Sequence, residues 1–324
     1  MRVAVVVVAH GAGPHLDRTL AALEHQTHKP ARTIVVDNLG DMSEGLTPGH
    51  VELVKPERNL GFAAGNNVAV DMADDCEWVA LLNPDAFPEP CWLEKLLDAA
   101  HAHPEYSFFG SRLVMADDSG RLDGTGDIVH TSGMAWRRDH GAPTSRTRAG
   151  QEVFSPCAAA ALYRRGAFLE AGGFDERFFC YYEDSDLAFR LRLLGHRCLH
   201  VDDAVVHHVG SVTAGRTSDF TVYHSFRNQV WAFVKNMPAP LLWLYLPQHV
   251  LLNALQLLGY AAAGRPRVIL RAKRDALREL PRVLHERRAI QRRRRVGARA
   301  IRRSLGRGPS VYAFAASRIR MLRA

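Results

Sequence analysis

Acidic side chains crowd one short stretch of the chain. Glu183, Asp184 and Asp186 lie within four residues, directly after the aromatic and glycine-rich run GGFDERFFCYY of residues 172–182. The helix dipole favours acids in the first turn of a helix, which would give these side chains a purely structural role. Aromatic neighbours can instead raise the pKa of a carboxyl group, and a carboxylate tuned in this way suits a general base that takes a proton from a hydroxyl.

A second group of candidates follows two apolar runs. Asp85 is the fifth residue of the segment LLNPDA (81–86), just after an apolar strand. His207 and His208 follow a short β-branched run. Carboxylate oxygens are preferred by hard ions, so Asp85 is a candidate ligand of Mg²⁺ or Mn²⁺. A helix-capping turn rich in proline explains the same segment. The two histidines are candidate ligands of a metal or phosphate, and a structural role is equally compatible with their position.

A turn between predicted elements supplies a third kind of candidate, a place where backbone approaches a ligand closely. The segment NLGFAAGNN of residues 59–67 contains Gly61 and Gly65 and leads into a helix. Glycines permit close approach, and a helix N-terminus favours anions. Asn59 acting as an ordinary helix cap explains these residues as well.

Residues 11–16, GAGPHL, begin like the dinucleotide fingerprint GxGxxG, and Asp37 lies where a ribose-binding acid would. Leu16 replaces the third glycine, so the motif is incomplete. An NAD(P)-dependent oxidoreductase with a Rossmann-like N-terminal domain is therefore kept as an alternative. A sugar-nucleotide pyrophosphorylase would need a basic residue in this glycine-rich loop, which the segment does not provide.

The elements that must position these residues alternate along the first hundred positions. Apolar runs predict buried strands, and helical spacing predicts helices between them: strands at 2–9, 33–36, 51–54 and 78–82, and helices at 16–23, 61–73 and 92–102. This alternation predicts an α/β fold with a parallel sheet and helices on both faces. Functional groups in such sheets lie at the carboxyl ends of the strands, and Asp37 and Asp85 both fall there.

The middle of the chain is less regular. Residues 112–152 are rich in Gly, Asp, Arg and Thr and predict loops and irregular strands over the active site. Small apolar residues predict one buried strand at 153–163. A helix is expected at 183–194, and two short strands at 198–201 and 204–206.

Charge is distributed unevenly between the body and the C-terminal part. The 324-residue chain carries a net charge of +8, but residues 265–324 alone hold 20 Lys and Arg against 3 acids, which leaves the rest of the chain mildly acidic. A basic tail indicates an anionic membrane or nucleic acid as its partner. No aromatic–basic interleaving and no zinc-ligand spacing supports nucleic acid, so no nucleic-acid partner is expected.

Residues 240–263 form an apolar segment just before this basic tail. Its length would span a bilayer, but His249, Asn253, Gln256 and Tyr260 recur at helical spacing and share one face. This pattern favours a helix lying in the membrane surface, with a spanning helix and a helix packed on the body as alternatives. The neighbouring arginines then predict an anchor for anionic lipids.

Cysteine usage and the N-terminus bear on the compartment. The five cysteines are scattered and form no CxxC pair, which is typical of reduced thiols in the cytosol. The opening residues, MRVAVVVVAH, lack the long apolar region and cleavage site of a signal peptide. We therefore expect a peripheral protein on the cytoplasmic face of the cell membrane.

Six motifs, in this order, resemble the inverting glycosyltransferases of family 2, and within them the rhamnosyltransferase-like branch. They are VVVVAH within 3–10, VVDN at 35–38, NLGFAAGNN at 59–67, LLNPDA at 81–86, GGFDERFFCYYEDSDLAFRLRLLGH at 172–196 and VVHHVGS at 205–211. The resemblance implies a GT-A fold, an open mixed sheet flanked by helices. It places a nucleotide-sugar-binding half at 1–105, an acceptor and catalytic half at 106–236, and a hydrophobic helix with a basic tail at 237–324.

The same resemblance assigns roles to the candidate residues. Asp184 acts as catalytic base beside Glu183, and Asp85 binds the metal together with His207, a role that His208 could fill instead. The residues expected to line the nucleotide sugar are Ala9, His10, Asp37, Asn38, Asn59, Gly61, Gly65, Asn66 and Asn83. Two departures stand out: Asn83 occupies the place where many relatives carry the first acid of an Asp-x-Asp, and His10-Gly11 differs from the usual pair.

The reaction implied is transfer of a sugar from a nucleotide-diphosphate donor to an acceptor hydroxyl with inversion, aided by Mg²⁺ or Mn²⁺. Within the family, dTDP-rhamnose is the first candidate donor, ahead of UDP-hexoses and UDP-galactofuranose. The expected acceptor is a glycan, or a polyprenyl-linked glycan, of cell-envelope polysaccharide synthesis. A protein that has lost its activity is the remaining alternative, against which the intact Asp85, Glu183 and Asp184 speak.

Overall fold

The computed structural model describes residues 1–42, 51–210 and 218–320. Its strands are β1 Val3–Ala9, β2 Arg32–Asp37, β3 Val51–Val54, β4 Trp78–Leu82, β5 Ala86–Pro88, β6 Phe108–Met115, β7 Leu122–Gly124, β8 Asp127–Val129, β9 Ala135–Arg137, β10 Glu152–Val153, β11 Ala160–Arg164 and β12 Cys198–His208. Its helices are α1 Pro14–Glu24, α2 Gly61–Met72, α3 Trp92–Ala102, α4 Arg165–Glu170, α5 Glu183–Leu193, α6 Asp219–Asn236, α7 Ala239–Ala262, α8 Pro266–Arg278, α9 Leu280–Arg293, α10 Ala298–Ser304 and α11 Ser310–Arg320, with a 3₁₀ helix at Glu176–Phe178. All strands and helices predicted for the first hundred residues are present.

One mixed sheet organises the described residues. Its central order is β10-β12-β6-β11-β4-β1-β2-β3, with β5 and β7 paired at its margin. Strands β1 to β4 pair in parallel, and β11 runs antiparallel between β4 and β6. The sheet is therefore mixed, as expected for a GT-A fold, and it joins the first part of the chain to the middle part without a break.

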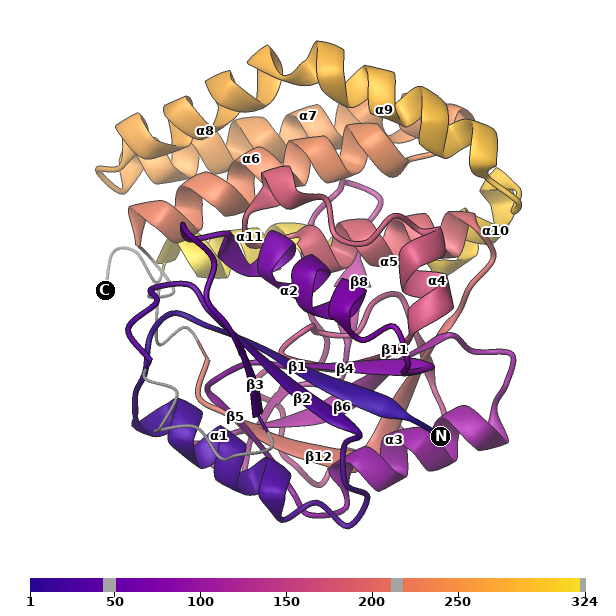
Figure 1. Ribbon diagram of the computed structural model, residues 1–324. Coiled ribbons are helices and arrows are strands. Elements are labelled where there is room, and N and C mark those ends of the chain that lie inside the picture. Colours follow the sequence, from indigo (N-terminus) through magenta and orange to yellow (C-terminus); the bar gives the residue numbers. More distant parts are fainter. Residues whose placement is uncertain (43–50, 211–217, 321–324) are drawn as a thin grey trace.

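Helices cover both faces of this sheet. Figure 1 shows α1 and α3 on one side and α2, α4 and α5 on the other. Side chains of β1 alternate between the two cores: Val5 and Val7 pack toward α1 and α3, and Val6 and Val8 pack toward α2. Because both faces are buried, the strand reads as an unbroken apolar run.

The predicted strand at 153–163 is wrong in its extent. The chain forms β10 at the edge of the sheet, leaves the sheet, and returns as β11 in its centre. Pro156 lies in the interruption, where it packs on Gly110 and can donate no ladder hydrogen bond. The two strands predicted at 198–206 are instead one strand, β12, with a register shift between Val201 and Val205.

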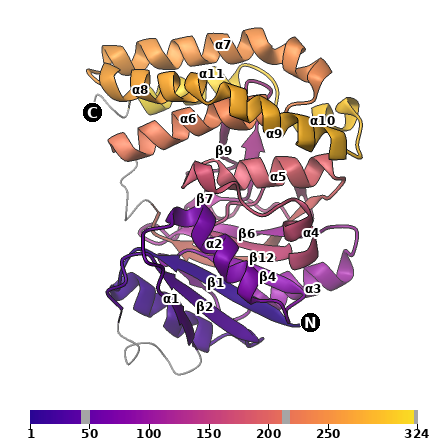
Figure 2. The same cartoon turned by 45° about the horizontal axis from the view of Figure 1, so that its top comes forward.

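The C-terminal part forms a helical layer of its own. Helices α6 to α9 lie beyond α5 (Figure 1), and α7 runs along the outer edge in the tilted view of Figure 2. The less apolar residues of α7 do share one face, as predicted, and this face is turned inward: His249, Gln256 and Tyr260 are buried. The outward face carries exposed apolar side chains, so α7 has its polar side on the protein and its apolar side on the surface.

Candidate active site

A row of carboxylate, histidine and carboxylate lies where β4 and β12 end. The pairing of β5 with β12 places His208 next to Asp85, with Nε2 of the imidazole 3.4 Å from Oδ1 of the carboxylate. The other ring nitrogen, Nδ1, is 2.7 Å from Oδ2 of Asp123. The second oxygen of Asp85 accepts a 3.1 Å hydrogen bond from the N–H of Gly210. All three side chains of the row are buried.

Electrostatic contacts within this row favour the charged forms of Asp85 and His208. Burial alone would lower the pKa of His208, but hydrogen bonds to Asp123 and Asp85 outweigh it and raise that pKa. Burial would likewise raise the pKa of Asp85, and the histidine and backbone N–H groups lower it instead. Asp85 is therefore ionised, with an imidazole nitrogen directed at one of its oxygens.

Asp85 and His208 fit part of a divalent-cation site. Asp123 holds the far nitrogen of His208, as outer-shell carboxylates do for metal-binding histidines. In the part of the chain that the structure describes, no group of three or more His, Cys, Asp or Glu side chains is arranged to hold a metal by itself. Mg²⁺ in nucleotide-using enzymes takes one or two protein ligands and completes its shell with phosphate oxygens and water, which matches this pair.

Two further predicted residues flank the pair differently. The side-chain oxygen of Asn83 is buried and has no hydrogen-bond partner within the described residues, so it is an acceptor available to a ligand. His207 points to the opposite face of β12, as consecutive strand residues do, and its Nε2 lies 3.3 Å from Oε1 of Glu89. The structure thus brings His208, and not His207, to Asp85.

Three carboxyl groups converge at the start of α5. Glu183 and Asp184 open this helix, and Asp127 begins β8 nearby. Burial raises the pKa of each, and mutual repulsion adds to the rise for Glu183 and Asp127. Glu183 and Asp127 are only 6% and 8% exposed, whereas Asp184 is half-buried. Asp184 is therefore the member of the group that a substrate can reach.

Arg137, the last residue of β9, joins the two groups. Its guanidinium donates a hydrogen bond to Asp123 and lies 3.5 Å from Nδ1 of His208. Its positive charge also lowers the pKa of Asp184 and Asp127, against the effect of burial. One cation thus lies beside His208 and close enough to Asp184 to lower its pKa, so it is near both predicted centres.

The loop before α5 is held in an unusual conformation. Phe179, Tyr181 and Tyr182 have φ angles of 64°, 67° and 70°, which L residues rarely adopt. Asn228 on α6 is fully buried, and its amide donates hydrogen bonds of 2.7 to 3.0 Å to three carbonyls of this loop. Strained backbone held by its surroundings is typical of functional sites, and here it sets the direction in which α5 begins. The Cβ of an alanine at Gly61 would meet the Phe179 ring at 2.6 Å.

The predicted nucleotide-sugar residues gather at the carboxyl ends of β1 and β2. Asn38 accepts a 2.9 Å hydrogen bond from the N–H of Leu60, and Asn59 accepts one of 2.8 Å from Gly61. The amide nitrogen of Asn59 lies 3.5 Å from Nδ1 of His10, the residue after β1. These contacts shape the turn into α2 and keep His10 and Asn59 exposed beside it.

Four of these residues face the protein interior. Gly65 packs on β1, and Asn66 donates its amide to a carbonyl one turn earlier in α2. Ala9 is buried at the end of β1. The carboxylate of Asp37 is fully buried and accepts hydrogen bonds from two N–H groups of residues 39–42. Their nucleotide contacts stay predictions, and in this structure their side chains support the neighbouring turns.

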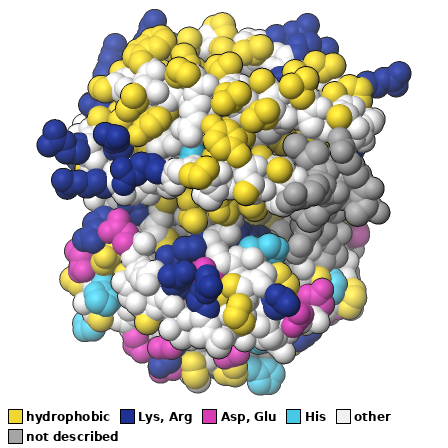
Figure 3. Space-filling view, turned by 180° about the vertical axis from the view of Figure 1, so that it is seen from behind, with side chains coloured by type: hydrophobic (Ala, Val, Ile, Leu, Met, Phe, Trp, Pro, Cys, Tyr) yellow, Lys and Arg dark blue, Asp and Glu magenta, His cyan; other side chains and the backbone are white. Residues whose placement is uncertain are grey.

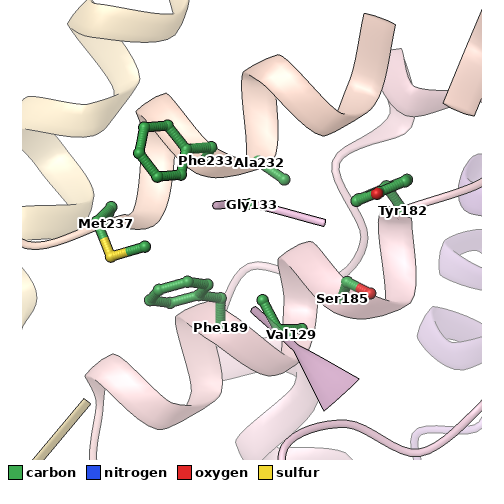
Figure 4. Close-up of a pocket in the computed structure, with 8 residues that line it drawn as sticks. All are labelled: Val129, Gly133, Tyr182, Ser185, Phe189, Ala232, Phe233 and Met237. Atoms are coloured by element: carbon green, nitrogen blue, oxygen red, sulfur yellow. The ribbon is translucent and has the colours of Figure 1, made fainter. Parts of the chain in front are cut away.

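A small cavity lies between α5 and α6 (Figure 4). Its lining is Val129, Gly133, Tyr182, Ser185, Phe189, Ala232, Phe233 and Met237. Its volume of about 10 Å³ is at the lower limit for a single water, so it is a packing gap between α5 and α6 and not a substrate pocket. Asp184 and Arg137, which do not line this cavity, are partly exposed.

Sequence reasoning misses Asp123, Asp127 and Arg137. All three lie in residues 112–152, where the expected loops and irregular strands do cover the site. The strands that carry these three residues, β7, β8 and β9, are three residues long, too short for a periodic pattern to show which side chains point inward. The abundance of Asp and Arg was the available signal, and it does not single out these three.

Residues 4–172, more than half of the 324-residue chain, match the model of glycosyl transferase family 2. The chain is 30% identical over 243 residues to N-acetylglucosaminyl-diphospho-decaprenol L-rhamnosyltransferase of Mycobacterium tuberculosis. This match covers 65% of this chain and 77% of the mycobacterial protein. It is 28% identical to the O-antigen biosynthesis protein RfbC of Myxococcus xanthus over 63% of this chain and 17% of that protein.

Solved structures share the fold. GalNAc-T7 with UDP, GalNAc and Mn²⁺ superposes with a TM-score of 0.58 at 15% identity, over 72% of this chain and about half (48%) of that one. Mannosyltransferase PcManGT from Pyrobaculum calidifontis, with GDP-Man and Mn²⁺, superposes with a TM-score of 0.51 at 18% identity, over 94% of this chain and 86% of that one. At such identities the likeness establishes the GT-A fold alone.

These matches give no support to the oxidoreductase alternative, because the family model covers the same N-terminal residues that carry the incomplete dinucleotide motif. The expected GT-A fold is confirmed. The chain therefore belongs to glycosyl transferase family 2 and is an enzyme that transfers a sugar from a nucleotide sugar.

Proposed function

We propose that this enzyme transfers rhamnose from dTDP-rhamnose to a hydroxyl of a polyprenyl-linked glycan, with inversion, in cell-envelope polysaccharide synthesis. Another hexose carried by UDP is the second candidate donor. The observation that carries the reaction type is that Arg137 lies near both Asp184, a half-buried carboxylate of raised pKa, and His208 of the Asp85–His208 pair. The mycobacterial relative, named as a decaprenol-linked rhamnosyltransferase, supports the choice of donor and acceptor.

The residues of the site suggest how the transfer proceeds. Asp184 accepts the proton of the acceptor hydroxyl, and the oxygen attacks the anomeric carbon on the side opposite the diphosphate. The bond from that carbon to the diphosphate breaks, its electrons leave with the nucleoside diphosphate, and the configuration inverts. Burial raises the pKa of Asp184 and keeps it basic, while the positive charge of Arg137 opposes that rise. Asp85 and His208 would hold Mg²⁺ or Mn²⁺, which would supply positive charge beside the leaving diphosphate.

A donor panel tests this proposal. We expect dTDP-rhamnose to exceed UDP-glucose, UDP-galactofuranose and GDP-mannose in kcat/KM by at least about tenfold, because a site built for one sugar leaves polar groups unpaired with another. The acceptor is polyprenyl-diphosphate-linked N-acetylglucosamine, and mass spectrometry with NMR of the product gives the sugar and its anomeric configuration. A retained configuration would contradict the mechanism, and a preference for a UDP sugar would move the assignment to the second donor.

We further propose that residues 237–324 hold the enzyme at the cytoplasmic face of the membrane, with residues 1–105 binding the nucleotide sugar and residues 106–236 the acceptor. Helix α7 is long and apolar enough to cross a membrane by length and composition, the one such helix in the described residues. The buried polar face of α7 makes contacts with residues 131 and 132. The hydroxyl of Thr131 donates a hydrogen bond to Oε1 of Gln248, and Nδ1 of His249 lies 2.7 Å from the carbonyl oxygen of Ser132. These bonds favour a helix that lies on the membrane with its apolar face outward.

Vesicle flotation tests the membrane contact. The triple variant Leu244→Ser, Leu251→Ser, Leu258→Ser is expected to bind vesicles at least about tenfold more weakly, because each exposed leucine would lose apolar burial in the lipid. Leu169→Ser with Met72→Ser, exposed positions on the body, serves as the control and should bind as the wild type does. Equal binding by both variants would count against α7 as the contact. Deleting the tail is a poorer test, since it would also remove Met237 and Leu241 from the buried core cluster that they share with Phe189 and Phe233.

A further inference from the structure

An open groove runs between the start of α7 and the outer side of α9. It has a volume of about 400 Å³, within the range of small-ligand sites. Its lining is Ala239, Pro240, Leu284, Arg287, Arg288, Gln291 and Arg294. The groove belongs neither to the catalytic site nor to the small cavity behind α5, and no step of the transfer reaction uses it.

Positive charge in this groove is uncompensated. Three of the lining side chains are arginines and none is acidic, and no carboxylate in the described part of the chain forms a salt bridge with Arg287, Arg288 or Arg294. The neighbouring Arg295 and Arg177, by contrast, pair with Glu170 and Glu286.

The groove is also built and not merely a cluster of flexible side chains. Arg287 is 9% exposed, and its guanidinium donates hydrogen bonds of 2.7 and 2.5 Å to the carbonyls of Val234 and Met237 at the end of α6. Gln291 donates to the carbonyl of Asn236. Burial and the like charge of Arg294 lower the pKa of Arg287, as expected where two cations face one space without an anion.

The groove opens beside the apolar face of α7. Pro240 lines the groove, and Trp243 and Leu244, on the next turn of the same helix, are 70% and 56% exposed. Tryptophan at such a border is typical of side chains that lie at the level of lipid headgroups. Figure 3 shows apolar side chains over much of this helical layer, with Lys and Arg gathered toward its edges.

We infer that the groove between α7 and α9 binds the phosphate of an anionic membrane lipid, while the apolar face of α7 lies against the acyl chains. Arginine is the side chain best matched to phosphate oxygens, which it can bind through two parallel N–H groups. The inference rests on the membrane placement proposed above. It differs from that placement in requiring one discrete phosphate-binding site, whereas diffuse attraction between a basic tail and an anionic membrane requires no such site.

Vesicle binding by the full-length enzyme separates these two possibilities. The groove variant Arg288→Gln, Arg294→Gln leaves the structurally bonded Arg287 in place. The control Arg292→Gln, Arg299→Gln removes the same charge from two exposed arginines that do not line the groove. With vesicles of phosphatidylcholine and phosphatidylglycerol, we expect the groove variant to lose about 10- to 30-fold in binding, from roughly a fivefold loss for each of the two charge–phosphate contacts, and the control only a fewfold.

Three further measurements decide the outcome. Both variants should transfer sugar to a soluble acceptor at the wild-type rate, which separates a failure of this inference from a failure of the proposed activity. Equal losses in the two variants would overturn the discrete site in favour of diffuse attraction. Binding of inorganic phosphate that is lost in the groove variant, with no preference of the wild type for phosphatidylglycerol over pure phosphatidylcholine, would assign the groove to a soluble phosphate. Tighter binding to DNA than to the charged vesicles would overturn the lipid assignment as well.

Discussion

Replacing Asp184 by Asn is expected to lower kcat by about 100- to 10,000-fold, the usual contribution of a general base. The amide keeps the size of the carboxyl group but cannot accept the proton of the acceptor hydroxyl. Asp184 is positioned by the N–H of Ser185, which donates a 2.6 Å hydrogen bond to its Oδ1 and should serve an amide oxygen equally. Donor affinity, measured by calorimetry with dTDP-rhamnose, should therefore change little.

The control for this variant is Asp203→Asn, the same chemical change at an exposed residue of β12. It should transfer at the wild-type rate, and near-normal turnover of the Asp184 variant would show that another group is the base. The wild-type pH profile gives a second readout. Because the pKa of Asp184 is raised, its carboxylate is protonated at a higher pH than that of an ordinary Asp. On acidification, kcat/KM should therefore begin to fall at a pH above the range in which an ordinary Asp titrates.

The α/β framework was accessible from sequence because its signals are local. The fully buried valines of β1 alternate between two cores, and such a strand shows as a continuous apolar run whatever its neighbours are. The extent of β10 and β11 was not accessible. Whether a stretch of small residues continues as a strand depends on partners that are distant in the sequence, here β12 for the first piece and β4 with β6 for the second.

The sequence predicted those site residues that belong to a recognisable motif and missed the others. Glu183, Asp184 and Asp85 belong to recognisable segments, and the structure joins them through Arg137, which belongs to none. The choice between the two adjacent histidines needed the pairing of β5 with β12, since strand register alone decides which of them faces Asp85. Register is set by the whole sheet, so no reading of the histidine pair itself could have settled it.

Replacing Asp85 by Asn is expected to lower kcat/KM by about 100-fold or more, since a cation beside a leaving diphosphate contributes several kcal/mol and each 1.4 kcal/mol is a factor of ten. The variant removes one of the two protein ligands and leaves His208 with Asp123 as its remaining carboxylate partner. Chelation of the wild-type enzyme with EDTA should cause a comparable loss, restored by Mn²⁺ or Mg²⁺. The affinity for Mn²⁺ in the presence of nucleoside diphosphate, followed by calorimetry, should fall in the same variant.

Two neighbours of this site sharpen the test. Glu89→Gln makes the same change in a half-exposed carboxylate that pairs with His207, and it should retain activity and Mn²⁺ affinity. His208→Ala should weaken Mn²⁺ binding by about 10-fold or more, whereas His207→Ala should not, because only His208 lies beside Asp85. Unchanged transfer in EDTA, or normal Mn²⁺ affinity in the Asp85 variant, would remove the metal from this site. The positive charge at the leaving diphosphate would then have to come from Arg137, the other cation next to Asp123, and Arg137→Gln would become the substitution that abolishes transfer.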